Sequence, residues 1–211
     1  MMTRASVIQQ IEQYFDQNQF FSDLRRRVGI PTESQVPDRS VELHRYLQDE
    51  IATELAGMGF TYTIENNPVV GGGPVLIAHR EEDPASTTVL TYGHGDVVQG
   101  YDDQWRRDLS PWVLTQDGDR WFGRGSADNK GQHTINLAAL RHVLANRGRL
   151  GFNIKVLIET GEEVGSIGLR EFCEVNKDRL SADVFIASDG PRIAPARPTV
   201  FMGSRLSLIH I

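Results

Sequence analysis

The sequence contains a single cysteine, Cys173, among 211 residues. One cysteine excludes an internal disulfide and suits a reducing compartment such as the cytoplasm. No apolar run approaches the ~20 residues that a membrane-spanning helix requires. The first residues, MMTRASVIQQIEQYFDQ, are polar and amphipathic and lack the apolar centre of a signal peptide. We therefore expect a soluble cytoplasmic protein with no membrane partner.

Positive charge is also scarce. The chain has 22 Lys and Arg residues against 28 Asp and Glu residues, for a formal net charge of −6, and its longest basic run is Arg25 to Arg27. A nucleic acid or an anionic membrane requires a basic surface, so this balance argues against either as a partner. A chain of 211 residues can bury one sizeable core, and it shows neither an internal repeat nor a low-complexity linker. We expect one domain.

The spacing of apolar residues predicts helices over Ser6 to Arg27, about Arg39 to Met58 and about Lys130 to Asn146, and a further helix over VGSIGLREFCEVN. Segments rich in β-branched and aromatic residues predict strands at FTYTIE, PVLIAHR, TTVLTYGH, FNIKVLIET, ADVFIASD and RPTVFMG. Asp117-Gly118 predicts a hairpin between WVLTQ and RWFGR. Strands that alternate with helices, several of them continuous apolar runs, indicate an α/β fold with a mixed, mostly parallel sheet buried under helices on both faces.

Potential metal ligands follow the predicted strands or begin a predicted helix. These residues are His94, Asp96, Asp128, Glu162, Glu163 and Asp189. In an open α/β sheet ligands bind at the carboxyl ends of the strands, so we expect these residues to converge on one crevice. One neutral imidazole with several carboxylates suits Zn²⁺, Mn²⁺ or Co²⁺, and the absence of a thiolate argues against a structural zinc site.

Each of these residues also has an ordinary structural explanation. A histidine after a strand is more often a satisfied core or surface residue, and Glu162-Glu163 is a common solvated helix start. Asp128 could cap a helix, and Asp189-Gly190 is an ordinary turn. Their shared position at element ends within one domain favours the metal site.

The strings GHGDVV, GRGSADNKG, ETGEEVGS and ASDG, in this order, resemble the aminoacylase, acetylornithine deacetylase, succinyl-diaminopimelate desuccinylase and carnosinase family of dinuclear zinc peptidases. IPTESQ and DQWRRDLSPW match the same pattern, and the resemblance extends from about Ile8 to Arg205. It implies a zinc-exopeptidase-like catalytic domain that cleaves amide bonds of N-acyl amino acids or small peptides with a metal-activated water. It also implies two divalent metal ions as cofactors, zinc before cobalt or manganese.

The resemblance assigns the metal ligands residue by residue. His94 and Asp189 would bind one metal ion, Glu163 would bind the second, and Asp128 would bridge the two. It also implies a cis peptide bond between Asp128 and Asn129.

Two further residues receive catalytic roles from the resemblance. Asp96 would hold the imidazole of His94 and fix its tautomer. Glu162 would act as the general base, accepting a proton from water and delivering it to the leaving amine.

The family pattern continues beyond what this sequence contains. A dimerising lid domain normally interrupts the catalytic domain, and the lid and the resumed domain each supply a histidine to the site. We therefore expect residues 1–205 to be the N-terminal part of the catalytic domain, and the parent protein to be a homodimer through its lid. The last residues, 206–211 (LSLIHI), resemble a translated sequencing adapter and are expected to be a non-native tail, so His210 is not expected as a ligand. The chain alone is expected to be inactive and poorly soluble.

Other functions are compatible with parts of this pattern. A non-catalytic domain could keep the fold and use the cleft for binding, but the intact Asp96, Glu162 and ligand set argue against it. A one-metal aminopeptidase of related fold is disfavoured by GRGSADNKG, which fits a bridging aspartate. The sequence does not separate dipeptidase or carboxypeptidase action from N-deacylation.

Overall fold

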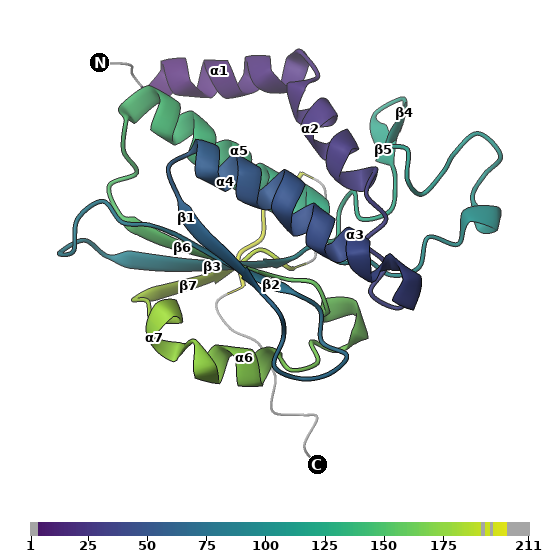
Figure 1. Cartoon of the computed structure of the whole chain (residues 1–211). Helices are drawn as coiled ribbons and strands as arrows, with labels where there is room; N and C mark the ends of the chain where they lie inside the picture. Colours follow the sequence, from purple (N-terminus) through teal and green to yellow (C-terminus); the bar gives the residue numbers. More distant parts are fainter. Residues whose placement is uncertain (1–3, 191–192, 195, 202–211) are drawn as a thin grey trace.

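The computed structural model describes residues 4–190, 193–194 and 196–201. Its main sheet has five strands in the order β1-β2-β6-β3-β7 (Figure 1). The strands are β1 (Thr61–Glu65), β2 (Val75–Arg80), β3 (Thr88–His94), β6 (Asn153–Glu159) and β7 (Val184–Ala187). The expected non-native tail at 206–211, with His210, lies outside the described residues. The strand predicted at RPTVFMG is absent from its described part, which ends at Phe201.

The sheet is mixed, as predicted, but it is less parallel than expected. Strand β3 pairs in parallel with both β6 and β7, whereas β2 pairs antiparallel with both β1 and β6. A short loop, 66–74, joins β1 to β2, and strands joined by a short loop must run antiparallel because a parallel return needs a long crossover. Within this five-stranded sheet, two pairings are parallel and two are antiparallel.

Helices cover both faces of the sheet (Figure 1). On one face lie α5 (Lys130–Arg147) and a continuous helix formed by η1 (Pro37–Arg39), α3 (Ser40–Arg45), η2 (Tyr46–Ala52) and α4 (Thr53–Gly57), in which η2 is a π-helical segment. On the other face lie α6 (Leu169–Val175) and α7 (Lys177–Leu180). The helix predicted over 39–58 and the helix predicted over 130–146 are confirmed.

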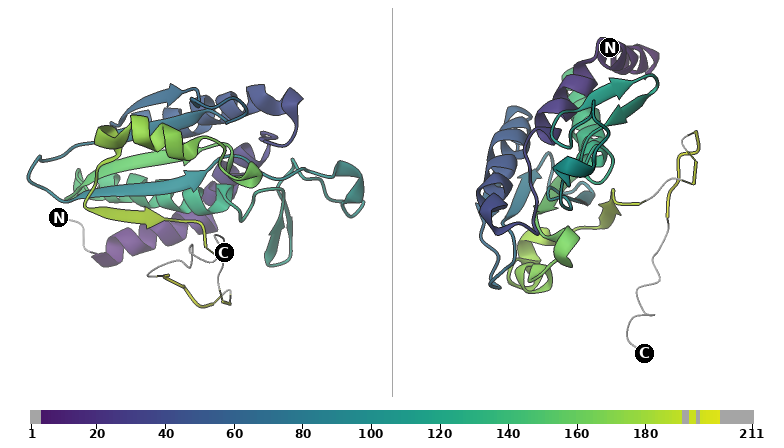
Figure 2. Two further views of the ribbon diagram at one scale, coloured as in Figure 1. Left: turned by 90° about the horizontal axis from the view of Figure 1, so that it is seen from below. Right: turned by 90° about the vertical axis from the view of Figure 1, so that its right-hand side faces the viewer.

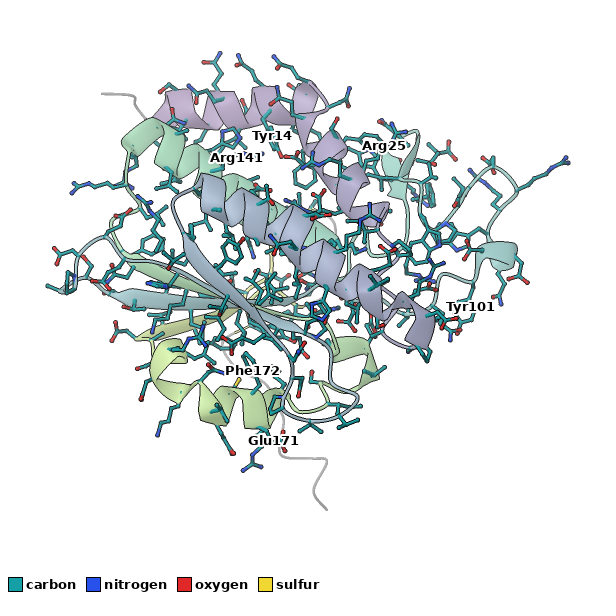
Figure 3. All side chains as sticks on the ribbon, viewed as in Figure 1. Tyr14, Arg25, Tyr101, Arg141, Glu171 and Phe172 are labelled. Carbon is teal, nitrogen blue, oxygen red and sulfur yellow. The ribbon has the colours of Figure 1, made fainter. Side chains whose placement is uncertain are left out.

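The alternating side chains of each strand build two cores. Leu76 in β2 packs with Leu47 and Ile51 of the π-helical segment, whereas its neighbour Ile77 packs with Phe172 of α6 on the opposite face. Figure 3 shows Phe172 directed toward the sheet and the preceding residue, Glu171, directed away from it. The helices are therefore held to the sheet by apolar burial on both sides.

The expectation of a sheet buried on both faces fails at strand β7. Phe185 is 62% exposed, and Val184 and Ile186 are also exposed. Strand β7 is at the edge of the described sheet and pairs only with β3 there. Its apolar sequence therefore predicted a strand correctly but not its degree of burial.

The N-terminal segment forms two helices rather than the single predicted one. Helix α1 (Arg4–Asp16) and helix α2 (Gln19–Val28) are separated at Asn18, which has a left-handed φ of 58°. Asparagine tolerates this conformation better than most residues, so the polar stretch 16–19 breaks the helix without proline or glycine. Apolar spacing continues across the break, which is why periodicity alone missed it.

Buried and half-buried ion pairs attach α2 to the helices that cover the sheet. Arg27 is fully buried, pairs with Glu54 and donates to Thr134 Oγ1 at 2.6 Å. Asp23 accepts hydrogen bonds from Tyr14 at 2.6 Å and Arg141 at 2.9 Å, and the labelled side chains in Figure 3 show Tyr14 and Arg141 close together.

The predicted hairpin is present as β4 (Thr115–Asp117) and β5 (Arg120–Phe122), with Gly118 at a positive φ of 62°. The hairpin and the loop before it project from the sheet (Figure 2). Trp121 of the hairpin stacks on Phe20 of α2, with ring centroids 5.9 Å apart. No helix within the described ranges is both long and apolar enough to cross a membrane.

Leu76→Ala should lower the free energy of unfolding by about 2–5 kcal/mol, because Leu76 is fully buried and truncation leaves a cavity. Val70→Ala is the control, since Val70 is almost fully exposed and should change stability by less than about 0.5 kcal/mol. Urea denaturation of both variants measures the difference. Equal losses would mean that this layer of the core is not packed as described.

Asp23 should make stability sensitive to acid. Burial disfavours its charge, but hydrogen bonds from Tyr14 and Arg141 outweigh burial and lower its pKa from 3.8 to about 2. A depressed folded-state pKa contributes stability above pH ~4 that is lost as the pH falls toward ~2. Asp23→Asn should therefore lower the melting temperature at pH 7 and flatten its decline between pH 4 and 2. Asp16→Asn, at an exposed aspartate, should do neither.

Candidate metal centre

The predicted ligands lie at one edge of the sheet. Strands β3, β6 and β7 are parallel, so their carboxyl ends meet there, and His94 at the end of β3 lies opposite Glu159 at the end of β6. The chain leaves β3 through α5 on one face and leaves β6 through α6 and α7 on the other (Figure 1). Neighbouring strands whose connections go to opposite faces leave a crevice between them, which is where α/β sheets bind ligands.

The imidazole of His94 is at the centre of this crevice. It is fully buried, and its Nε2 atom lies 2.9 Å from Asp128 Oδ1, 3.8 Å from Asp189 Oδ1 and 3.9 Å from Glu162 Oε2. Within the described part of the chain, one group of potential metal ligands is found: atoms of His94, Asp128 and Glu163 that all lie within 4.8 Å of one another. The structure thus brings together the residues that the sequence placed on separate loops.

Asp96 connects His94 to the glutamate turn that follows β6. Its side-chain oxygens accept the backbone N–H groups of Glu162 at 3.2 Å and Glu163 at 3.1 Å. Its Oδ1 also lies 3.3 Å from Nδ1 of His94, and its own carbonyl oxygen lies 3.0 Å from the same nitrogen. With Nδ1 directed at these acceptors, Nε2 is left to face the carboxylates, as a metal-binding histidine requires.

A second buried carboxylate lies beneath the same turn, and the sequence analysis did not identify it. Glu159 Oε1 accepts hydrogen bonds from the Tyr92 hydroxyl at 2.6 Å and from Ser166 Oγ at 2.8 Å. The backbone N–H of Ser166 donates to Gly161 at 2.8 Å, so Glu159 holds the far end of the turn that carries the two site glutamates. An acidic residue at the end of an apolar strand was the available signal.

The loop before α5 supplies Asp128, whose side chain is 65% exposed. The peptide bond between Asp128 and Asn129 is cis, as predicted. Asn129 is fully buried and was also missed by the sequence analysis. Its amide donates to Asp189 Oδ1 at 3.1 Å, so it connects the loops of two predicted ligands.

Negative charge accumulates in the crevice. Burial raises the pKa of Glu162, and the nearby carboxylates of Asp189 and Asp96 raise it further. The pKa of Glu163 is raised by burial and then by Asp128. Burial lowers the pKa of His94, but its hydrogen bond to Asp96 and the surrounding carboxylates outweigh burial and raise that pKa to about 9. The carboxylates thus create a strong demand for positive charge at this point.

This donor set fits a divalent cation. A buried imidazole nitrogen and carboxylate oxygens are ligands that zinc and similar transition metals accept, and a cation would offset the repulsion between the carboxylates. Asp96 supplies the outer support that metal-binding histidines usually have.

Together, the fold and the site define an α/β domain with a candidate metal centre at the ends of its parallel strands. The model of peptidase family M20/M25/M40 matches residues 90–199, and the chain belongs to this family. The resemblance inferred from the four sequence strings is therefore confirmed, and membership implies binding of divalent metal.

Known proteins are similar to this chain in both sequence and fold. The chain is 32% identical to human Beta-Ala-His dipeptidase over 95% of this chain and 42% of that protein. It is 29% identical to the Cysteinylglycine-S-conjugate dipeptidase of Corynebacterium striatum, over 88% of this chain and 40% of that protein. The crystal structure of human carnosine dipeptidase 1 superimposes with a TM-score of 0.78 at 32% identity, covering 89% of this chain and 41% of that one. The chain therefore spans about two fifths of the length of these relatives.

Asp96→Asn should weaken metal binding by about 10–100-fold, the usual effect of removing a residue that supports a metal ligand. An amide cannot accept hydrogen bonds at both side-chain atoms, so either the histidine or the glutamate turn loses a partner. Competition for Zn²⁺ against a chromophoric chelator measures the dissociation constant. Asp117→Asn, at an exposed aspartate in the hairpin, is the control and should leave it unchanged. Wild-type affinity in Asp96→Asn would contradict the role of Asp96.

Proposed function

We propose that the protein is a metal-dependent hydrolase that cleaves the amide bond of dipeptides and related small peptides. The observation that carries this proposal is the convergence of His94, Asp128 and Glu163 within 4.8 Å beside the carboxylate of Glu162. Two relatives are named as dipeptidases, which supports a short peptide as the substrate rather than an N-acyl amino acid. Both substrate classes present the same amide bond to the site.

We further propose that the site holds two divalent metal ions, zinc in the native protein. Asp128 would bridge them, His94 and Asp189 would complete one site, and Glu163 would contribute to the other. The exposure of Asp128 and its short distance to Nε2 of His94 suit a carboxylate that reaches two ions. When bound, such ions polarise a substrate carbonyl and lower the pKa of a bound water molecule.

Glu162 is proposed as the general base. Its carboxylate lies 3.9 Å from Nε2 of His94, close to the ligands, and its raised pKa brings it nearer to neutral pH. A base works best when its pKa approaches the operating pH, because it must both accept and return a proton. Glu162 would take a proton from water and pass it to the departing amine nitrogen. Asp96 would hold Glu162 through its backbone N–H, so that base and ligands keep one geometry.

We also propose the dimeric assembly and the two-metal content that the family resemblance implies. At its natural length the protein should be a homodimer with two zinc ions per chain. Light scattering measures the mass of the assembly, and elemental analysis of purified protein measures the metal content. A monomeric mass would contradict the homodimer. A single equivalent of metal at saturation would contradict the two-metal site.

Glu162→Gln and Glu163→Gln should separate the base from the ligand. At the protein's natural length, Glu162→Gln should keep its metal and lower kcat for dipeptides by about 10²–10⁴-fold, the usual contribution of a general base. Glu163→Gln should instead lose metal from one site. Elemental analysis and a panel of dipeptides and N-acyl amino acids measure both effects.

Glu171→Gln is the matched control, because Glu171 faces solvent on α6 and should retain both metal and activity. If Glu162→Gln and Glu163→Gln keep metal and activity alike, the division of roles between the two glutamates is wrong. Turnover restricted to N-acyl amino acids would contradict the proposal that peptides are the substrates. It would remain consistent with the proposed amide hydrolysis.

A further inference from the structure

Three buried polar side chains lie in a row behind the candidate metal centre. Asn129 precedes α5, His133 is in its first turn, and Tyr46 begins the π-helical segment η2. Asn129 and Tyr46 are fully buried, and His133 is 3% exposed. None of the three is a predicted metal ligand. Hydrogen bonds nevertheless link them, one after another, to the predicted ligand Asp189.

Each hydrogen bond in this row fixes which atom donates and which atom accepts in the next. The side-chain nitrogen of Asn129 donates to Ser188 O at 2.7 Å and to Asp189 Oδ1 at 3.1 Å. Asn129 Oδ1 must therefore be an acceptor, and it lies 3.2 Å from Nδ1 of His133. That nitrogen then carries the proton, which leaves Nε2 of His133 to accept the hydrogen bond from the Tyr46 hydroxyl.

Two glycines leave the space that this row fills. A Cβ atom on Gly93 would lie 2.9 Å from Asn129 Oδ1, and one on Gly95 would lie 2.8 Å from the ring of Tyr46. Both distances are shorter than a side chain can accommodate without displacing its neighbour. The two glycines flank His94, so the asparagine amide and the tyrosine ring contact the backbone on either side of this histidine.

The hydrogen-bonded row ends at Asp189, one of the predicted metal ligands. Asp189 follows β7, the exposed edge strand, and its carboxylate is in a crevice crowded with negative charge. Repulsion would drive it outward, whereas the N–H group of Asn129 holds it at 3.1 Å. The same asparagine accepts the backbone N–H of His94 at 3.4 Å, so one side chain connects the end of β3 to the loop that follows β7.

We propose that Asn129 is a positioning residue that fixes Asp189 relative to His94 for metal binding, and that His133 and Tyr46 fix the orientation of its amide. This inference rests on the metal site of the proposed function. Asn129 would act on the metal ion only through Asp189 and His94. His133 is held neutral, because burial lowers its pKa well below the ordinary value, so it carries the single N–H that the row requires.

The test compares metal affinity among variants of the protein at its natural length. Asn129→Ala should raise the Kd for Zn²⁺ about 10–100-fold, as loss of a supporting partner usually does, and it should change the absorption spectrum of bound Co²⁺. His133→Leu should act in the same direction. His133→Asn should restore part of the affinity, because its amide can still donate to Asn129 Oδ1. Tyr46→Phe removes only the hydroxyl and should have the smallest effect.

Thr134→Val is the matched control. Thr134 follows His133 in the same helix and is equally buried, but its hydroxyl bonds Arg27 and the carbonyl of Lys130 rather than the site. It should lower the melting temperature in the presence of a chelator while leaving the Kd for Zn²⁺ and the Co²⁺ spectrum unchanged. This separates a positioning effect from a general loss of stability.

The possible outcomes separate this inference from the proposed function. If the unchanged protein binds neither Zn²⁺ nor Co²⁺, the metal site is wrong and the inference fails with it. If the unchanged protein binds metal and Asn129→Ala binds equally well with the same Co²⁺ spectrum, only the inference is overturned. A loss of affinity in Thr134→Val equal to that in Asn129→Ala also overturns it. Should Asn129→Ala fail to fold, a wild-type Kd in both His133→Leu and Tyr46→Phe is the contradicting result.

Discussion

The parallel pairing of β3 with both β6 and β7 is the constraint on which the rest of the site depends. Parallel neighbours end at the same edge of a sheet, so the loops after these strands meet although they are far apart in the sequence. The two crossovers then place α5 on one face and α6 with α7 on the other, which opens the crevice between the strand ends. A different pairing of β7 would place Asp189 away from His94.

This convergence creates an electrostatic problem. Carboxylates gather around a single imidazole. Burial and then mutual repulsion raise the pKa values of Glu162 and Glu163, whereas attraction to the carboxylates raises the pKa of His94 against the effect of burial. The protein opposes the repulsion with directed donors. Backbone N–H groups hold Asp96, and side-chain donors hold Glu159 and Asp189. The candidate site is thus preorganised by groups that contact the proposed ligands as well as by those ligands themselves.

The helices help to position the loop after β7, which the strand itself anchors poorly. Strand β7 is exposed at the edge of the described sheet, so burial does little to anchor the loop that follows it. Helix α5 and the π-helical segment contribute to the main core, and their residues His133 and Tyr46 are hydrogen-bonded in a row with Asn129, which immediately precedes α5. In the proposed arrangement these side chains hold Asp189, which follows the exposed edge strand, against the rigid core.

The sequence by itself located most of the elements and the residues of the candidate site. Apolar runs marked β3, β6 and β7, and the residues after them identified His94 and the carboxylates, because strand ends are local features that periodicity and composition reveal. Only the tertiary structure decided the antiparallel placement of β2, the exposure of β7 and the break at Asn18. It also decided the partners of Asn129 and Glu159, because those hydrogen bonds join residues up to 60 and 67 positions apart. Periodicity describes one segment at a time, whereas these contacts depend on how separate segments pack.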